Sequence, residues 1–195
     1  MLKAAYRLTT IWGIPIKLHI SLLVLLGLFV FQTVRAGGTL LHIALVVVLA
    51  LGAFTSIALH ELGHSFVAMR KGCRVREITL MILGGVAQME NVPTRPRDEV
   101  QMAIAGPAVS LLLGGILSVG GTLMIARGVG VAGDLLQLLG FWNLVLAGFN
   151  LLPAFPMDGG RVLRSALAGR LGRLKATRIA TQIGKVVAAG FILVG

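Results

Sequence analysis

The stretch LLHIALVVVLALGAFTSIALHELGHSFVAM, residues 40–69, is a thirty-residue apolar run that ends in two histidines and a glutamate. As a helix it is about 45 Å long, which is more than enough to cross about 30 Å of hydrocarbon. Ionisable side chains are costly at membrane depth, so His60, Glu61 and His64 are functional candidates. Histidines four residues apart share a helical face and can bind one metal ion, with the intervening glutamate as general base. The alternative is a hydrogen-bonded histidine pair in a helix bundle, which leaves Glu61 unexplained.

Composition places the whole chain in a membrane. Hydrophobic residues make up 56% of it and charged residues 13%, whereas about a quarter of a typical soluble domain is charged. We therefore expect one membrane domain over residues 1–195. The net charge of +11 does not predict nucleic-acid binding, because the basic residues form no stripe with interleaved aromatics. The single cysteine, Cys73, excludes an internal disulfide and a cysteine-based zinc site.

Further apolar stretches predict a mainly α-helical, polytopic membrane protein. Spans are expected at residues 18–34, 40–69, 102–126 and 129–152, with a fifth beginning near Thr177. The last one is still apolar at Gly195, and only ten residues follow Lys185, about 15 Å of helix. The expectation is a chain cut within its last helix, and a half-inserted terminal helix is the alternative.

Basic residues predict the orientation of these spans. Sixteen of the eighteen lysines and arginines lie on one side, and only Arg35 and Arg127 fall in the opposite loops. The positive-inside rule makes the rich side, with the N-terminus, cytoplasmic. His60 lies about 30 Å along the helix from Leu40, so the histidines should lie toward the cytoplasmic leaflet. The expected location is the plasma membrane of a prokaryote.

Residues 72–99 form the one sizeable segment without a helical pattern. Within it, ITLMILGGV at residues 78–86 combines β-branched and long apolar residues with paired glycines. This predicts a small β element, a hairpin or an edge strand, between the second and third spans. An exposed edge could bind an extended peptide as an added strand, with Ile82, Gly84, Gly85 and Val86 as tentative substrate-binding residues. A hairpin that lies along the membrane surface is the alternative.

A third metal ligand is sought because catalytic zinc usually has three protein ligands and a water. The candidate is Asp158, within NLLPAFPMDGGR at residues 150–161. Pro153 and Pro156 cannot lie in an unbroken helix, so the fourth span should unwind there. Irregular backbone at membrane depth is tolerated where protein or a watery cavity surrounds it. Asp158 could instead cap the helix that follows.

These motifs together resemble those of the site-2 proteases, which are intramembrane zinc metallopeptidases. The resemblance covers nearly the whole chain, and the 60–64 metal motif and the 150–160 signature are its specific parts. The weaker matches are GIPIKLHIS at residues 13–21, LGGVA at 83–87 and AGP at 105–107. The chain has Ser110 where the family often has asparagine, and it has no room for the PDZ domain that some members insert.

The resemblance implies one Zn²⁺ per chain, held by His60, His64 and Asp158. It also implies that Glu61 activates water and that Asn150 contacts the oxyanion or the substrate backbone. The implied activity is hydrolysis of single-span membrane proteins near the cytoplasmic leaflet, with the bilayer as the other partner and the oligomeric state open. A non-proteolytic metal-binding protein or transporter, or a catalytically silent relative, is the alternative.

Two groups of polar residues are not assigned to the site. His19 and His42 each stand alone and are expected at helix ends or interfaces. The remaining carboxylates near the predicted β element are expected to face solvent or to pair with neighbouring arginines. They are Glu77, Glu90, Asp98 and Glu99.

Overall fold

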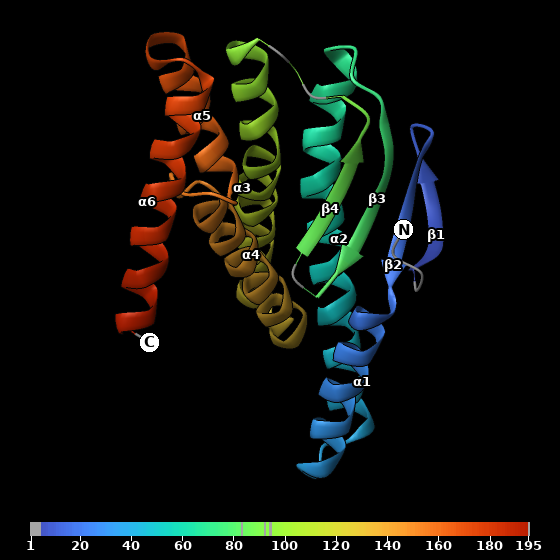
Figure 1. The fold of residues 1–195 in the computed structure, drawn as a ribbon. Coiled ribbons are helices and arrows are strands. Elements are labelled where there is room, and N and C mark those ends of the chain that lie inside the picture. Colours follow the sequence, from blue (N-terminus) through green and yellow to red (C-terminus); the bar gives the residue numbers. More distant parts are fainter. Residues whose placement is uncertain (1–4, 83, 92, 94, 195) are drawn as a thin grey trace.

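Ten elements follow one another in the computed structural model, which describes residues 5–82, 84–91, 93 and 95–194 (Figure 1). They are β1 (Ala5–Ile11), β2 (Ile14–His19), α1 (Ile20–Arg35), α2 (Leu40–Arg70), β3 (Val75–Met81), β4 (Gly84–Met89), α3 (Pro96–Ala126), α4 (Gly130–Asn150), α5 (Asp158–Leu171) and α6 (Arg173–Val194). The prediction of a mainly helical protein with a small β element is confirmed. Lys3 of the charge count and Leu83 of the glycine-bearing motif lie outside the described residues.

Three helices in the described part of the chain are long and apolar enough to cross a membrane, namely α2, α3 and α4. The first predicted span is displaced along the chain: α1 begins at Ile20 and has 16 residues, about 24 Å, which is less than about 30 Å of hydrocarbon. Leu18, the first residue of that predicted span, pairs instead with Tyr6 in the β1–β2 hairpin. The last predicted span also differs, because α6 begins at Arg173 and so includes basic residues in its first turns.

The four strands form one sheet in the order β1-β2-β3-β4. The hairpins β1–β2 and β3–β4 are antiparallel, and β2 joins them by pairing in parallel with β3, where Ile16 faces Ile78. The sheet is therefore larger than the one or two strands predicted, and its N-terminal hairpin was missed. β4 lies at one edge of the sheet, and among the described residues one side of this strand has no strand partner.

The sheet packs against α2 through a cluster of buried aliphatic side chains. Leu62 of α2 belongs to this cluster, and its exposed fraction is 4%. Residues two apart on a helix point to nearly opposite sides, so Leu62 faces the sheet while His60 and His64 face away from it. On that other side α3 lies close to α2. A Cβ at Gly63 would be only 2.9 Å from the Ala105 carbonyl oxygen, so glycine is what permits this approach.

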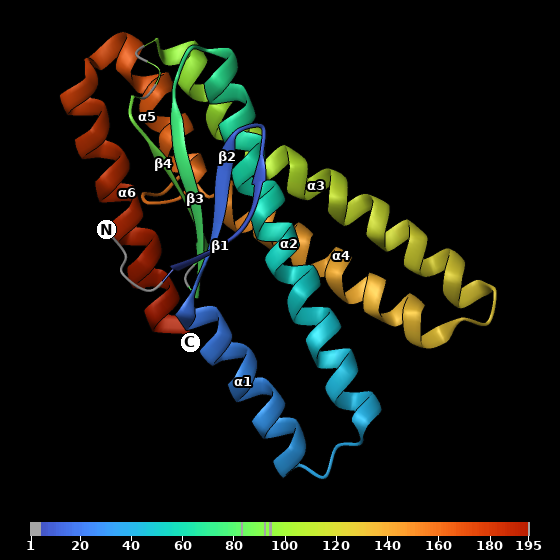
Figure 2. The ribbon, with the colours of Figure 1, turned by 90° about the vertical axis from the view of Figure 1, so that its right-hand side faces the viewer.

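α3 and α4 run side by side as a helical hairpin, and α5 and α6 cover one end of the bundle (Figure 2). Between α4 and α5 the chain is irregular over residues 151–157, where Pro153 and Pro156 lie. The predicted unwinding of the fourth span is therefore confirmed. It allows the chain to turn back toward α2 and to begin a new helix at Asp158.

Candidate metal centre

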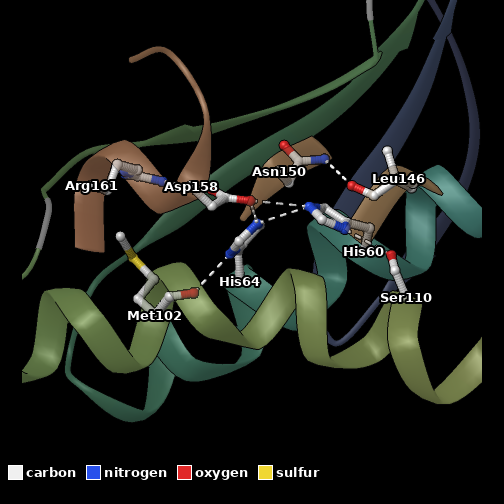
Figure 3. A network of polar contacts seen from close by, with 8 residues as sticks. All are labelled: His60, His64, Met102, Ser110, Leu146, Asn150, Asp158 and Arg161. Carbon is white, nitrogen blue, oxygen red and sulfur yellow. Dashed lines mark hydrogen bonds and ion pairs between the residues drawn. The ribbon is translucent and has the colours of Figure 1, made fainter. Parts of the chain in front are cut away.

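Three side chains from helices far apart in the sequence meet at one point (Figure 3). The Oδ2 atom of Asp158 lies 3.3 Å from Nε2 of His60 and 3.0 Å from Nε2 of His64. The two Nε2 atoms are 3.2 Å apart. All three residues are buried. The structure thus brings together the three residues that were predicted as metal ligands, in an arrangement that could hold one metal ion.

The position of Asp158 depends on the two glycines that follow it. A Cβ at Gly159 would lie 2.3 Å from the carbonyl oxygens of Leu151 and Leu152, and one at Gly160 would lie 2.6 Å from the Ala154 carbonyl carbon. Only glycine allows the irregular connection to fold so closely against the start of α5. Met157 occupies the N-cap position, and Asp158 lies in the first turn of the helix. Asp158 is therefore not the N-cap residue of α5, which was the alternative interpretation.

α3 supplies a hydrogen-bond partner to each imidazole. Nδ1 of His64 lies 2.7 Å from the carbonyl oxygen of Met102, and Nδ1 of His60 lies 2.9 Å from Oγ of Ser110. A carbonyl oxygen only accepts, so Nδ1 of His64 carries a proton, and in the neutral imidazole Nε2 then keeps the lone pair. This is the tautomer that a metal-binding histidine needs.

Sequence reasoning did not find these partners. Met102 and Ser110 lie four residues before and after Gly106, so all three share the helical face that points at the histidines. That spacing is a signal that could have identified Ser110. A backbone acceptor such as Met102 carries no side-chain signature.

Glycines let two backbone segments contact the motif. A Cβ at Gly106 would lie 2.2 Å from Nε2 of His64 and 2.7 Å from Nε2 of His60. A Cβ at Gly85 would lie 2.3 Å from Cγ of Glu61. The backbone N–H of Ala87, also in β4, donates a hydrogen bond to the Glu61 carboxylate. The edge strand therefore holds this carboxylate beside the three converging side chains.

Comparison with known proteins identifies the family. The model of peptidase family M50 matches residues 46–127 and 117–191. The chain belongs to peptidase family M50. It is 41% identical over 196 residues to a zinc metalloprotease of Methanocaldococcus jannaschii, covering 97% of this chain and 53% of that one. It is 31% identical over 124 residues to stage IV sporulation protein FB of Bacillus subtilis, covering 63% and 41% of the two chains.

A solved structure supports the same assignment. The M50 chain is similar to the site-2 protease from Methanocaldococcus jannaschii, with a TM-score of 0.71 and 38% identity over 98% of this chain and 84% of that one. The predicted resemblance to site-2 proteases is confirmed. With its three apolar helices, the M50 chain is an integral membrane protein. It spans about half the length of the relatives that it matches in sequence.

A cavity of about 680 Å³ opens onto His60, His64 and Asp158 of this M50 chain. Residues of α2, β4, α4 and α5 line it, among them Glu61, Asn150 and the predicted strand residues Gly84, Gly85 and Val86. Nδ2 of Asn150 donates a hydrogen bond to the Leu146 carbonyl oxygen at 2.9 Å, which uses one of its two amide hydrogens.

Ile82, the fourth tentative substrate-binding residue, is not among the residues that line the cavity. Its backbone N–H donates to Oγ of Ser21 at 3.3 Å, next to His19. His19 caps α1, and His42 interacts with Thr39 at the start of α2. Both histidines lie at helix ends, as expected.

Arg161 is a cavity residue that the sequence did not single out. Its Nη1 atom lies 3.9 Å from Oδ1 of Asp158, the carboxylate oxygen turned away from the imidazoles. The spacing of three residues on a helix is the signal that could have found this pair. Arg161 places a positive charge beside Asp158 and at the wall of the cavity.

Proposed function

We propose that the chain is an intramembrane zinc metalloendopeptidase that hydrolyses peptide bonds of single-span membrane proteins near the cytoplasmic leaflet. The observation that carries this proposal is the convergence of His60, His64 and Asp158 beside the Glu61 carboxylate at the wall of one cavity. Membership of peptidase family M50 supports the same chemistry.

The three converging side chains fit a zinc ion. Two ligands that are each about 2.05 Å from a tetrahedral zinc lie about 3.3 Å apart, and the three separations here are 3.0 to 3.3 Å. Two imidazole nitrogens and one carboxylate oxygen are a typical catalytic donor set. The unprotonated Nε2 atoms and the Asp158 oxygen would repel one another at these distances unless a cation lay between them. We therefore assign one Zn²⁺ per chain to His60, His64 and Asp158.

Glu61 is proposed as the general base. A zinc ion held at such a site supplies Lewis acidity and allows water to act as a nucleophile near neutral pH. Glu61 accepts the proton of that water and delivers it to the amine that leaves. The hydrogen bond from Ala87 and the contact with Gly85 keep the carboxylate in place for both transfers.

Asn150 is proposed as a donor to the substrate. Its side chain lines the cavity, and the amide hydrogen that Leu146 does not use is free to reach a carbonyl oxygen. A donor that meets the developing negative charge in the transition state is typically worth about 10²–10³ in rate.

β4 is proposed as the substrate-binding strand. A transmembrane helix hides its backbone carbonyls, so a substrate must unwind locally before it can be cleaved. Pairing with the open edge of β4 would hold the unwound segment extended and satisfy its amides. Gly84, Gly85 and Val86 line the cavity, and Val86 is 45% exposed. A peptide along this edge would pass beside Glu61.

The proposed orientation places the site toward the cytoplasm of a prokaryotic cell. The ends of α2 and α3 that approach the metal-binding group adjoin the loops that are rich in arginine and lysine. The positive-inside rule assigns that side to the cytoplasm. The N-terminal segment, the segment between α2 and α3 and the region after α4 all contribute to the same bias, so the argument does not depend on one segment.

A cleavage assay with Glu61→Gln separates the protease from a metal transporter. Purified protein in liposomes is incubated with a single-span model substrate, and zinc content is measured on the same samples. The wild type should cleave, and Glu61→Gln should retain its zinc and lose cleavage, since a glutamine cannot accept the proton. A transporter needs ligands but no base, so wild-type cleavage that survives in Glu61→Gln would refute the assigned role.

A further inference from the structure

Glu99, in the first turn of α3, is a buried carboxylate with an exposed fraction of 4%. This contradicts the expectation that it faces solvent or pairs with neighbouring arginines. Its Oε1 atom accepts a hydrogen bond from Arg164 of α5, and its Oε2 atom lies 3.5 Å from Nη2 of Arg173 at the start of α6. One carboxylate therefore joins three helices.

The same contacts lead to the segment that carries Asp158. The Arg164 guanidinium lies 5.3 Å from the centre of the Phe155 ring, and Phe155 belongs to the irregular connection 151–157. The backbone of Phe155 packs against α6, where a Cβ at Gly184 would lie 2.7 Å from the Phe155 carbonyl oxygen. Glu99 is thus linked through Arg164 to the connection that ends at Asp158.

The third metal ligand depends on this packing. α5 packs mainly on α3 and α6, whereas His60 and His64 belong to α2. Apart from the contacts between the ligand atoms, the position of α5 relative to α2 is therefore set mainly by the packing of both helices on α3. Whatever fixes α5 on α3 also fixes how closely Asp158 approaches the two imidazoles.

We infer that Glu99 is a positioning residue that clamps α5 and α6 onto α3 so that Asp158 meets the histidine pair. This inference rests on the proposed metal site. Without the Glu99 charge, Arg164 and Arg173 remain as two neighbouring cations, and Arg173 already acts electrostatically on Arg164. Breaking a buried ion pair at one partner leaves the other charge uncompensated, so α5 and α6 should move away from α3.

The position of α5 can be measured without metal. Spin labels at Arg97→Cys on α3 and Ala166→Cys on α5, both exposed sites, report the distance between the helices by pulsed electron resonance. Cys73→Ala removes the one native cysteine. In metal-free protein we expect a single narrow distribution that Glu99→Gln shifts or broadens. The matched control is Asp98→Asn, which instead breaks a 2.7 Å ion pair to Lys71, the residue that follows α2, and should leave the distribution unchanged.

Zinc affinity of the unlabelled protein supplies the second readout. Competition with a chromophoric chelator should show affinity at least tenfold weaker in Glu99→Gln and within twofold of wild type in Asp98→Asn. The double variant Glu99→Gln/Arg164→Gln should bind zinc no more weakly than the weaker of the two single variants, because the two residues act through one contact.

A Glu99→Gln protein with an unchanged distance distribution, or with wild-type zinc affinity at a lower melting temperature, would overturn the positioning role. A wild type that binds no zinc would instead remove the proposed function, and the metal-free distances would still decide whether Glu99 is a clamp.

Discussion

Nδ1 of His64 donates a hydrogen bond to the carbonyl oxygen of Met102, 2.7 Å away, so the backbone of α3 selects the tautomer of a neutral imidazole on α2. The Nε2 atom of His64 thereby faces Oδ2 of Asp158, 3.0 Å away. His60 has a different partner, the Ser110 hydroxyl, which can donate or accept. α3 thus holds both imidazoles, one through its backbone and one through a side chain.

Replacing Ser110 should weaken metal binding. Ser110→Ala leaves Nδ1 of His60 without its partner in a buried site, and loss of such a partner typically costs about 10- to 100-fold in metal affinity. Chelator competition measures the change. Ser110→Asn, which restores a polar group that the family uses there, should recover part of it. Thr122→Val removes a hydroxyl of α3 that pairs with Gln137 and serves as the control. Equal zinc affinity in Ser110→Ala and wild type would refute the role of Ser110.

A methyl group at Gly106 should disrupt the same site by steric conflict. The added Cβ of Gly106→Ala would lie 2.2 Å from Nε2 of His64, so the imidazoles or α3 must move. We expect zinc content well below one per chain and loss of cleavage. Gly115→Ala is the matched control, because a Cβ there meets nothing within 4 Å and alanine favours helix over glycine. A Gly106→Ala protein with full zinc content would show that the close packing is not required.

The edge strand is tested by removing a backbone donor from it. Val86→Pro should abolish cleavage and leave zinc content intact, because proline lacks the N–H by which Val86 pairs with Thr79 of β3 and so distorts the edge strand. Val86→Ala keeps the amide and separates that effect from loss of the side chain. Ile82 is a poorer site for this experiment, since its N–H already bonds to Ser21. Normal cleavage by Val86→Pro would exclude β4 as the substrate-binding strand.

The sequence predicted those features that follow from strong local costs. Ionisable residues in a long apolar run identified His60 and His64, and two prolines required the fourth span to unwind before Asp158. Both inferences need only the energetics of buried charge and of a missing N–H.

What the sequence missed depends on contacts between distant segments. Leu18 reads as the start of an apolar span, but pairing with β1 and β3 places it in a strand. Glu99 reads as a solvent-facing residue because its partners, Arg164 and Arg173, are at least 65 residues away in the chain. The partner of His64 is a backbone carbonyl, which no residue type reveals.

The central claim is that His60, His64 and Asp158 hold one zinc ion, and metal analysis of purified protein tests it most directly. Wild type should contain one zinc per chain. His60→Ala, His64→Ala and Asp158→Asn should each fall well below that level while remaining folded in detergent. Full zinc occupancy in any one of these three variants would contradict the assigned ligand set.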